Sequence, residues 1–171
     1  MENTKDYYEC QQFRQWWMWL ILIIIELSVL FFTFKIFTGT TEIMRPVTIL
    51  TALLVMFIPT LIIIFIFLLR LETKITAAGI STRFFPIFPN YKLFPWIEIK
   101  DAYIRSYKPI KEFGGYGMRY HITDRSRAFN IRGNFGIQLV FLDGTKLLIG
   151  TQHPDAAQKA VEQYFLEKNA V

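Results

Sequence analysis

Two long apolar stretches, residues 16–37 and 46–69, constrain the fold of this chain more than any other feature. The second stretch has no charged residue along its whole length. As helices that rise about 1.5 Å per residue, both are long enough to cross a membrane core of about 30 Å. Only residues 38–45 separate them, which is too few for a domain. The sequence therefore predicts an antiparallel two-helix transmembrane hairpin with a short loop at its tip.

The distribution of Lys and Arg near the ends of these stretches predicts which side of the membrane each segment occupies. The short loop contributes only Arg45, whereas Arg14, Arg70 and Lys74 flank the other ends. Basic residues collect on the cytoplasmic side of membrane proteins. We therefore expect residues 1–15 and residues 70–171 to be cytoplasmic, and the loop 38–45 to be external.

The first 15 residues do not resemble a secretory signal peptide. They are mostly polar and acidic, whereas a signal peptide opens with a basic segment and ends at a small-residue cleavage site. We therefore expect the first apolar stretch to remain in the protein as a membrane span. Cys10 is the single cysteine, so no disulfide can form within the chain, which suits a reducing compartment.

Glu26 is the only acidic residue in the first stretch, and its depth from Trp16 is about 15 Å. An unpaired carboxylate at this depth costs about 3 kcal/mol or more, so we expect Glu26 to be protonated or partnered. The same depth on the second stretch falls at Pro59 and Thr60. Because Pro59 leaves the carbonyl of Val55 without its helical donor, Glu26 can bond to that carbonyl or to the Thr60 hydroxyl. This intramembrane polar clamp competes with two alternatives, an ion pathway and pairing with another membrane protein or a second copy.

Residues 70–171 have ordinary polarity and the length of a single domain. They hold 15 of the 19 Lys and Arg residues but only 9 of the 14 Asp and Glu residues. A basic domain tied to a membrane can meet anionic lipid, nucleic acid or an acidic partner. The positive-inside bias produces the same excess without any partner.

Short stretches of strand character alternate with turn signals in this part. Gly133-Asn134 and Asp143-Gly144 predict β-hairpin turns, the second of type I′. Pro154 marks the start of a C-terminal helix whose apolar stripe is expected to pack on the sheet. The predicted strands cover residues 74–78, 79–85, 97–107, 116–123, 128–132, 135–142 and 146–150.

Local motifs carry a resemblance to bacterial PH-like domains. The order apolar, proline, Trp, Ile, acidic, Ile in Phe94–Ile99 resembles a strand entry of that group. Residues 135–139, 143–144, 147–152 and Pro154 are similar to its closing strands and helix start. The layout also resembles that of uncharacterised bacterial membrane proteins with two transmembrane helices and a C-terminal PH-like domain. The resemblance implies an α+β protein of the bacterial inner membrane, with an antiparallel PH-like β-barrel capped by a C-terminal helix.

No residue pattern indicates catalysis, a metal site or a cofactor. The two histidines, His121 and His153, have no His-x-x-x-His or Cys-x-x-Cys motif beside them, and such spacing is typical of zinc sites. The glycine-rich residues 112–117 lack the Gly-Lys-Ser/Thr ending of a phosphate-binding loop. We therefore predict no catalytic residues, no cofactor and no small-molecule substrate.

Two surface features are candidate binding sites. The first is the glycine-rich loop, which is either a binding loop on a rigid domain or a mobile hairpin tip without a ligand. Its residues are Gly114, Gly115, Tyr116 and Gly117. The second is a cluster of basic residues, which forms one binding rim if the strands pair as hairpins; the alternative is a solvated polar face. Its residues are Lys108, Lys111, Arg119, Arg125, Arg127 and Arg132. The aromatic segment 84–96 is a further candidate, either as a wedge into the membrane interface or as core and linker.

These features favour a non-enzymatic binding module in the bacterial inner membrane. The leading hypothesis is an adaptor or accessory subunit that holds a protein partner, or a second copy, at the membrane. The alternative is direct recognition of anionic lipid by the basic rim. An enzyme of unrecognised type is the third reading. Nucleic acid is not expected as a partner, because no recognition helix or RNA-binding signature is present.

Overall fold

The computed structural model describes residues 6–39, 46–121 and 126–169 of the chain. It divides into two compact units. One is helical and comprises residues 13–68, and the other joins residues 1–12 to residues 69–171. The second unit is α+β and its sheets are built mainly from antiparallel pairs. The α+β class and the antiparallel sheets are thus confirmed.

The helical unit contains α1 (Trp16–Gly39) and α2 (Pro46–Leu68). In the described part of the chain, one helical segment, Trp16–Lys35 of α1, is long and apolar enough to cross a membrane, and a signal sequence near an N-terminus has the same character. Leu53–Leu68 of α2 is a shorter apolar helix. The two helices touch, with the rings of Trp19 and Phe67 meeting edge to face at 6.0 Å.

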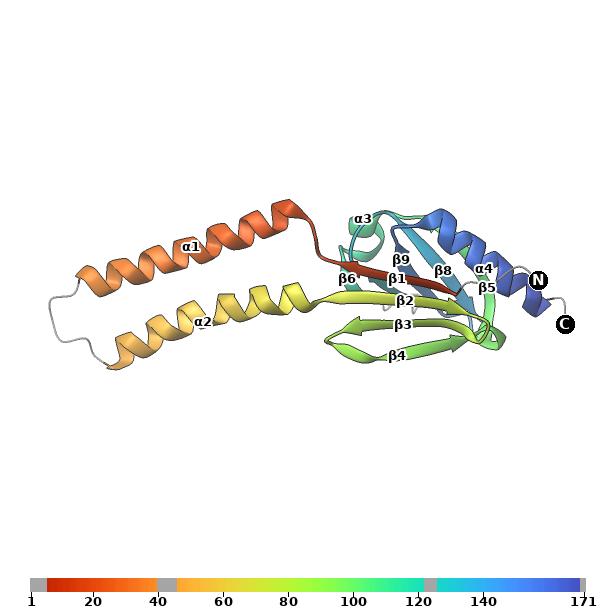
Figure 1. Cartoon of the computed structure of the whole chain (residues 1–171), viewed down its shortest axis with the longest axis horizontal. Coiled ribbons are helices and arrows are strands. Elements are labelled where there is room, and N and C mark those ends of the chain that lie inside the picture. Colours follow the sequence, from red (N-terminus) through yellow and green to blue (C-terminus); the bar gives the residue numbers. More distant parts are fainter. Residues whose placement is uncertain (1–5, 40–45, 122–125, 170–171) are drawn as a thin grey trace. The chain divides into compact units, whose positions relative to one another are not determined.

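Two sheets form the α+β unit (Figure 1), with strand orders β1-β2-β3-β4 and β5-β8-β9-β7-β6. In chain order the strands are β1 (Tyr7–Gln12), β2 (Arg70–Thr76), β3 (Gly79–Phe85), β4 (Phe88–Pro95), β5 (Ile99–Ser106), β6 (Gly117–His121), β7 (Ser126–Asn130), β8 (Phe135–Phe141) and β9 (Lys146–Thr151). The helical elements of the unit are η1 (Trp96–Glu98), α3 (Pro109–Phe113) and α4 (Pro154–Asn169).

Strand β1 comes before both long helices in the sequence, yet it pairs with β2, which follows them. The antiparallel register runs from Tyr7 opposite Ile75 to Gln12 opposite Arg70. Residues 13–69 therefore form one long excursion between two neighbouring strands. Residues 7–12 were not among the predicted strands, because their inward positions are polar and give no apolar alternation.

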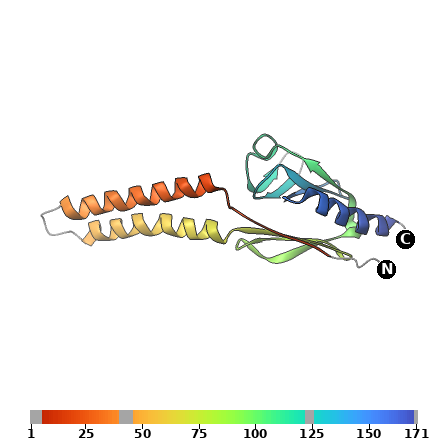
Figure 2. The ribbon, with the colours of Figure 1, turned by 45° about the horizontal axis from the view of Figure 1, so that its top comes forward.

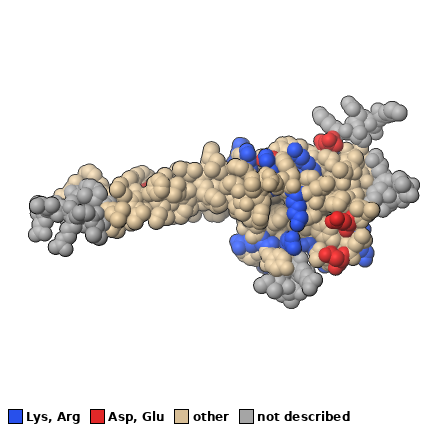
Figure 3. Space-filling view, turned by 90° about the horizontal axis from the view of Figure 1, so that it is seen from below, with Lys and Arg blue, Asp and Glu red and all other residues tan. Residues whose placement is uncertain are grey.

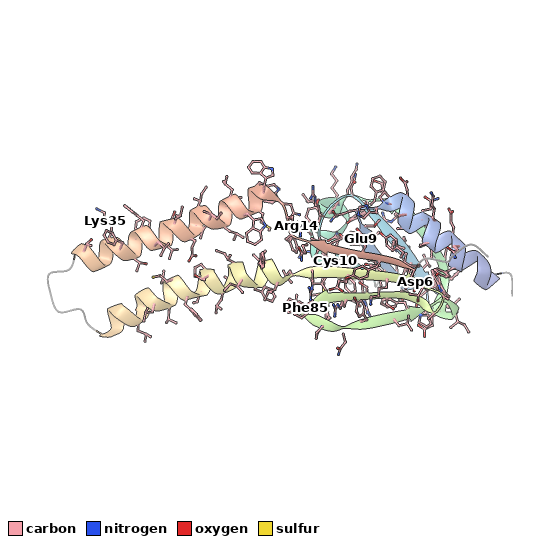
Figure 4. All side chains as sticks on the ribbon, in the orientation of Figure 1. Asp6, Glu9, Cys10, Arg14, Lys35 and Phe85 are labelled. Atoms are coloured by element: carbon pink, nitrogen blue, oxygen red, sulfur yellow. The ribbon has the colours of Figure 1, made fainter. Side chains whose placement is uncertain are left out.

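The inward side of β1 is held by hydrogen bonds to the end of β9. Glu9, which is buried, accepts bonds of 2.7 Å from Thr151 Oγ1 and 2.7 Å from the backbone N–H of Gln152. Gln11 Nε2 donates to the carbonyl of Gly150 at 2.5 Å. Figure 4 labels Glu9 together with its neighbour Cys10 on the same strand. These bonds join the two sheets at the edge where β1 lies.

Helix α4 lies alongside strands of both sheets (Figures 1 and 2), in contact with β1, β2, β5 and β8. Its predicted apolar stripe is buried, including Ala157, Val161 and Tyr164. Trp96 of η1 packs beside it, with its ring 6.0 Å from that of Phe165 and its indole N–H bonded to the carbonyl of Thr76. One opening between the sheets is therefore filled by a helix.

The predicted closed antiparallel barrel is not what the described strands form. They make two separate sheets, and β7 pairs with β9 in parallel. Gly133-Asn134 is not a hairpin turn either, since β9 lies between β7 and β8. Residues 131–134 must span two strand spacings, about 10 Å, whereas a two-residue turn spans one.

The β8–β9 connection is a hairpin as predicted, but its turn differs from the predicted type I′. The backbone of Phe141 exchanges bonds with Thr145 and Gly144, which makes Leu142–Gly144 a three-residue loop. Gly144 has a φ of +80°, the left-handed position that such loops place after a type I turn. Asp143 Oδ1 accepts from the backbone N–H of Thr145 at 2.9 Å and stabilises the loop.

We predict that Glu9→Ala lowers the free energy of unfolding of the α+β unit by about 1–3 kcal/mol, because it leaves buried donors unsatisfied. Pulse proteolysis of the full chain in non-ionic detergent across a urea series measures this change. Cys10→Ala is the matched control, since Cys10 is the exposed neighbour on the same strand. Equal stability of the two variants would contradict the role of Glu9.

Candidate functional site

The structure does not bring the predicted basic residues together on one rim. Arg119 of β6 stands opposite Ala128, whereas Arg127 of β7 stands opposite Tyr120. Successive positions on a strand face opposite sides of the sheet, so Arg119 and Arg127 point to different faces. The described members of the set are all exposed, namely Lys108, Lys111, Arg119, Arg127 and Arg132. Arg125 lies outside the described residues.

The glycine loop proves to be the C-terminal cap of the short helix α3. Gly114 adopts a left-handed φ of +71° and donates its N–H to the carbonyl of Ile110 at 3.0 Å. The N–H of Gly115 donates to the carbonyl of Pro109. A left-handed φ at this position favours glycine, because glycine has no Cβ that would clash with the backbone. Tyr116 and Gly117 continue from the cap into β6, with Tyr116 partly exposed.

The structure brings Glu26 and Thr60 together across α1 and α2. Thr60 Oγ1 lies 2.7 Å from Glu26 Oε1 and 2.9 Å from the carbonyl of Met56. A hydroxyl has one hydrogen, so it cannot donate to both. Thr60 therefore donates either to Glu26 or to the carbonyl of Met56, and both acceptors lie within hydrogen-bonding distance. Pro59 lies inside α2 beside this contact.

We predict that Thr60→Val weakens the association of α1 with α2 by about 0.5–1.5 kcal/mol, in the range of interhelical hydrogen bonds in membranes. Steric trapping of the full chain in bicelles measures the change. Ser28→Ala is the control, because the Ser28 hydroxyl donates to the carbonyl of Ile24 within its own helix. The clamp hypothesis fails if Thr60→Val and Ser28→Ala behave alike.

A cleft of about 810 Å³ lies between the two sheets of the α+β unit. Its walls come from β3 and β4 of the first sheet and from β7, β8 and β9 of the second. This volume falls in the range of about 300–1,000 Å³ that is common for small-molecule sites. Neither β1 nor α4 contributes a lining residue. The cleft is therefore distinct from the opening that α4 fills.

Aromatic side chains form the walls of the cleft. Phe84 and Phe94 are buried on the first sheet, and Phe129 and Phe141 face them from the second. The rings of Phe94 and Phe141 pack at 5.5 Å, where the walls meet. Phe88 is 57% exposed, so the apolar lining continues outward from the buried part.

Basic side chains stand around the cleft. Lys92 of β4, Arg127 of β7 and Lys146 of β9 all line it. Lys92 lies over the ring of Phe94 at 5.4 Å, and Arg127 lies 5.7 Å from the ring of Tyr120. Within the described chain, none of the three is paired with a carboxylate. Figure 3 shows a face on which Lys and Arg gather over this unit, apart from a smaller group of acidic residues.

A fourth cation of the lining, Arg83, is engaged on the outer face of the first sheet. Its Nη2 donates to Glu72 Oε1 at 2.8 Å, and Arg70 Nε lies 3.1 Å from the same oxygen. The hydroxyls of Tyr8 and Tyr91 donate to Glu72 Oε2. Glu72 is therefore only 2% exposed although it lies on an outer face.

These contacts set the titration of the cluster. Burial acts to raise the pKa of Glu72, but the hydrogen bonds from Arg83, Tyr91 and Tyr8 outweigh it and hold the pKa below its ordinary value. Burial and the bond to Glu72 raise the pKa of Tyr91. Both carboxylate oxygens of Glu72 thus have hydrogen-bond donors, and Glu72 fixes the position of Arg83. Lys92, Arg127 and Lys146 remain available to a ligand.

Among the described residues, no group of three or more His, Cys, Asp and Glu could hold a metal ion. The acidic members of the cleft lining are Glu98 and Asp143. Asp143 is occupied by Thr145 in the β8–β9 turn. The cleft therefore offers apolar walls and positive charge, which are the means to bind an amphipathic anion.

The cleft was not predicted from the sequence, although one of its walls belongs to a predicted candidate segment. The aromatic segment 84–96 forms the end of β3, the turn after it and β4. The opposite wall comes from residues 127–147, which no local pattern links to that segment. Both segments are rich in Phe, with four in residues 84–96 and three in residues 127–147, but this composition does not reveal that the two segments face each other.

We predict that Glu72→Gln lowers the free energy of unfolding by about 1–3 kcal/mol near neutral pH, because the buried charge-assisted bonds are lost. A depressed folded-state pKa stabilises above the unfolded pKa, and this contribution disappears as the pH falls through the folded pKa. The difference between wild type and Glu72→Gln should therefore be full above about pH 5 and shrink below about pH 4. Pulse proteolysis at several pH values measures it.

The control for this experiment is Glu98→Gln, since Glu98 is an exposed carboxylate on η1. It should leave the free energy of unfolding nearly unchanged at every pH. A difference between Glu72→Gln and wild type that does not depend on pH would contradict the assignment.

No protein-family model matches this chain, and no curated protein matches it. The fold and the cleft are therefore the basis for inferring its function.

Proposed function

We propose that this chain is a membrane-anchored, non-enzymatic binding module. In this proposal α1 and α2 cross the membrane as an antiparallel hairpin, and the α+β unit is a PH-like domain that lies on the cytoplasmic side with both termini. The cleft is its binding site. The membrane is the bacterial inner membrane, as the resemblance to bacterial PH-like proteins implies.

Strand β1 supports an anchor rather than a removable signal sequence. It precedes α1, pairs with β2 along its whole length, and places Glu9 in bonds with Thr151 and Gln152. Cleavage after α1 would separate β1 from the sheet it completes. The edge of that sheet and the buried polar groups at β9 would then lose their partners, which is costly. The fold thus favours a chain that keeps α1.

The same pairing supports two crossings. Because β1 and β2 are hydrogen-bonded neighbours, the excursion of residues 13–69 begins and ends on one side of any membrane. If α1 crosses, the chain must return, and α2 is the apolar helix that can bring it back. Leu69 is the only residue between α2 and β2.

The cleft is the observation that carries the binding function. It combines buried aromatic walls with three cations that have no carboxylate partner among the described residues, on a scaffold of two sheets and a helix. Such a site can hold an amphipathic molecule or part of a protein partner at the membrane. We therefore place the binding surface of the expected adaptor at the cleft, and not at the dispersed basic residues.

We predict that a photoreactive benzoylphenylalanine at Leu93 captures the occupant of the cleft in intact cells, because Leu93 lines the cleft and is 48% exposed. The control position is Ile97, which is 75% exposed but does not line the cleft. Adducts are resolved by mass spectrometry of the detergent-extracted chain. A defined adduct at Leu93 and none at Ile97 supports the proposal.

The absence of any specific adduct at Leu93, or equal capture at both positions, would contradict a binding function for the cleft. The mass of the adduct separates the two classes of occupant. A protein partner adds kilodaltons, whereas a lipid adds the mass of one molecule.

A further inference from the structure

We infer that the cleft holds one acyl chain of an anionic phospholipid, with the phosphate headgroup at Lys92, Arg127 and Lys146. The inference rests on the proposed function, because a membrane anchor keeps the α+β unit beside a source of lipid. It differs from lipid attraction by a basic surface, since it places the hydrocarbon chain inside the protein between the two sheets.

The walls suit a hydrocarbon chain. Phe84 and Phe94 on one sheet face Phe129 and Phe141 on the other. None of these four side chains has a polar atom. Burial of such a chain gains free energy in proportion to the apolar area removed from water. Phe88 and Leu142 extend the apolar lining to its exposed part, with exposed fractions of 57% and 68%. Apolar side chains therefore line both the buried and the exposed parts of the cleft.

The charges suit a phosphate. Lys92 comes from the first sheet and Arg127 from the second, so positive charge lines both walls, and Lys146 adds a third cation at the start of β9, on the edge of the second wall. Lysine ammonium groups and the arginine guanidinium bind phosphate oxygens through charge-assisted hydrogen bonds. None of these three cations is neutralised by a carboxylate within the described residues. An anionic headgroup would provide the missing partner.

An extended peptide fits the cleft less well. It would have to add to β4, the edge strand that lines the cleft. Pro89 and Pro95 remove two N–H donors from β4, and the β3–β4 register is broken between Thr82 and Phe84. Edges interrupted by proline and bulges resist the addition of a strand. The geometry thus favours a ligand that needs no backbone pairing.

The test uses the full chain in nanodiscs of phosphatidylcholine that contain a trace of a photoreactive lipid. In one arm the probe is phosphatidylglycerol with a diazirine near the end of one acyl chain, and in the other it is phosphatidylcholine with the same group. After illumination, peptide mapping locates the adducts. We expect phosphatidylglycerol adducts on the strands that line the cleft, and few from phosphatidylcholine.

Two sets of variants separate the cleft from general surface attraction. The first combines Lys92→Gln, Arg127→Gln and Lys146→Gln, and it should reduce the cleft adducts by about tenfold or more. The second combines Lys100→Gln, Lys111→Gln and Lys159→Gln, which removes the same charge from exposed positions outside the cleft lining. The second set should retain the adducts of the wild type.

A further pair of variants tests the path of the acyl chain. Leu142→Asp places a charge in the exposed part of the lining, and it should also reduce the cleft adducts. Ile110→Asp is its control, because Ile110 is 75% exposed on α3 and lines no part of the cleft. All of these side chains are exposed, so each variant can fold, and its protease resistance verifies that it does.

Adducts confined to α1 and α2, or equal loss in both triple variants, would overturn the lipid assignment. If Leu93 nevertheless captures a protein in cells, the cleft remains a binding site and only the choice of ligand is wrong. If the cleft captures neither lipid nor protein, the proposed function fails together with this inference.

Discussion

The pairing of β1 with β2 is the contact on which the rest of the structure depends. It joins residues on either side of the excursion 13–69 into one sheet. The inward side chains of β1 then connect that sheet to the other one, through Glu9 at Thr151 and Gln11 at Gly150. Closing so long a segment costs loop entropy that grows only slowly with length. A six-residue strand with buried hydrogen bonds can offset that cost. The first sheet of the α+β unit is therefore complete only when the residues on both sides of the helices have come together.

Two sheets that do not close into a barrel leave openings between them, and the chain treats these openings differently. Helix α4 contacts strands of both sheets and buries its apolar stripe. Between β3–β4 and β7–β9, α4 contributes nothing to the lining, and aromatic walls remain accessible there together with cations that have no carboxylate partner among the described residues. Glu72 neutralises Arg83 on the outer face of the first sheet, so the cations of the lining without a carboxylate partner among the described residues are Lys92, Arg127 and Lys146. Fold and candidate function thus have a common origin in the incomplete closure of the sheets.

Local patterns allowed much of the fold to be predicted. The apolar stripe of α4, the turn at Asp143-Gly144 and the proximity of Glu26 to Thr60 follow from periodicity, turn chemistry and depth. Long-range pairing could not be predicted in this way. Gly133-Asn134 shows that the chain reverses, but not that β9 inserts between β7 and β8. Strand β1 was missed because its inward residues satisfy hydrogen bonds instead of packing in an apolar core, and the cleft because its walls come from strands far apart in sequence.

The central claim, that β1 and the remainder of the α+β unit lie on one side of the membrane, can be tested directly with the single native cysteine. Cys10 is exposed on β1, and Ile110→Cys in a Cys10→Ala background reports on the rest of the unit. A membrane-impermeant maleimide is applied to intact cells and to inverted vesicles at alkaline pH, because burial raises the pKa of Cys10. The account predicts that both cysteines react in inverted vesicles and are protected in intact cells. Reaction of the two cysteines from opposite sides would contradict it.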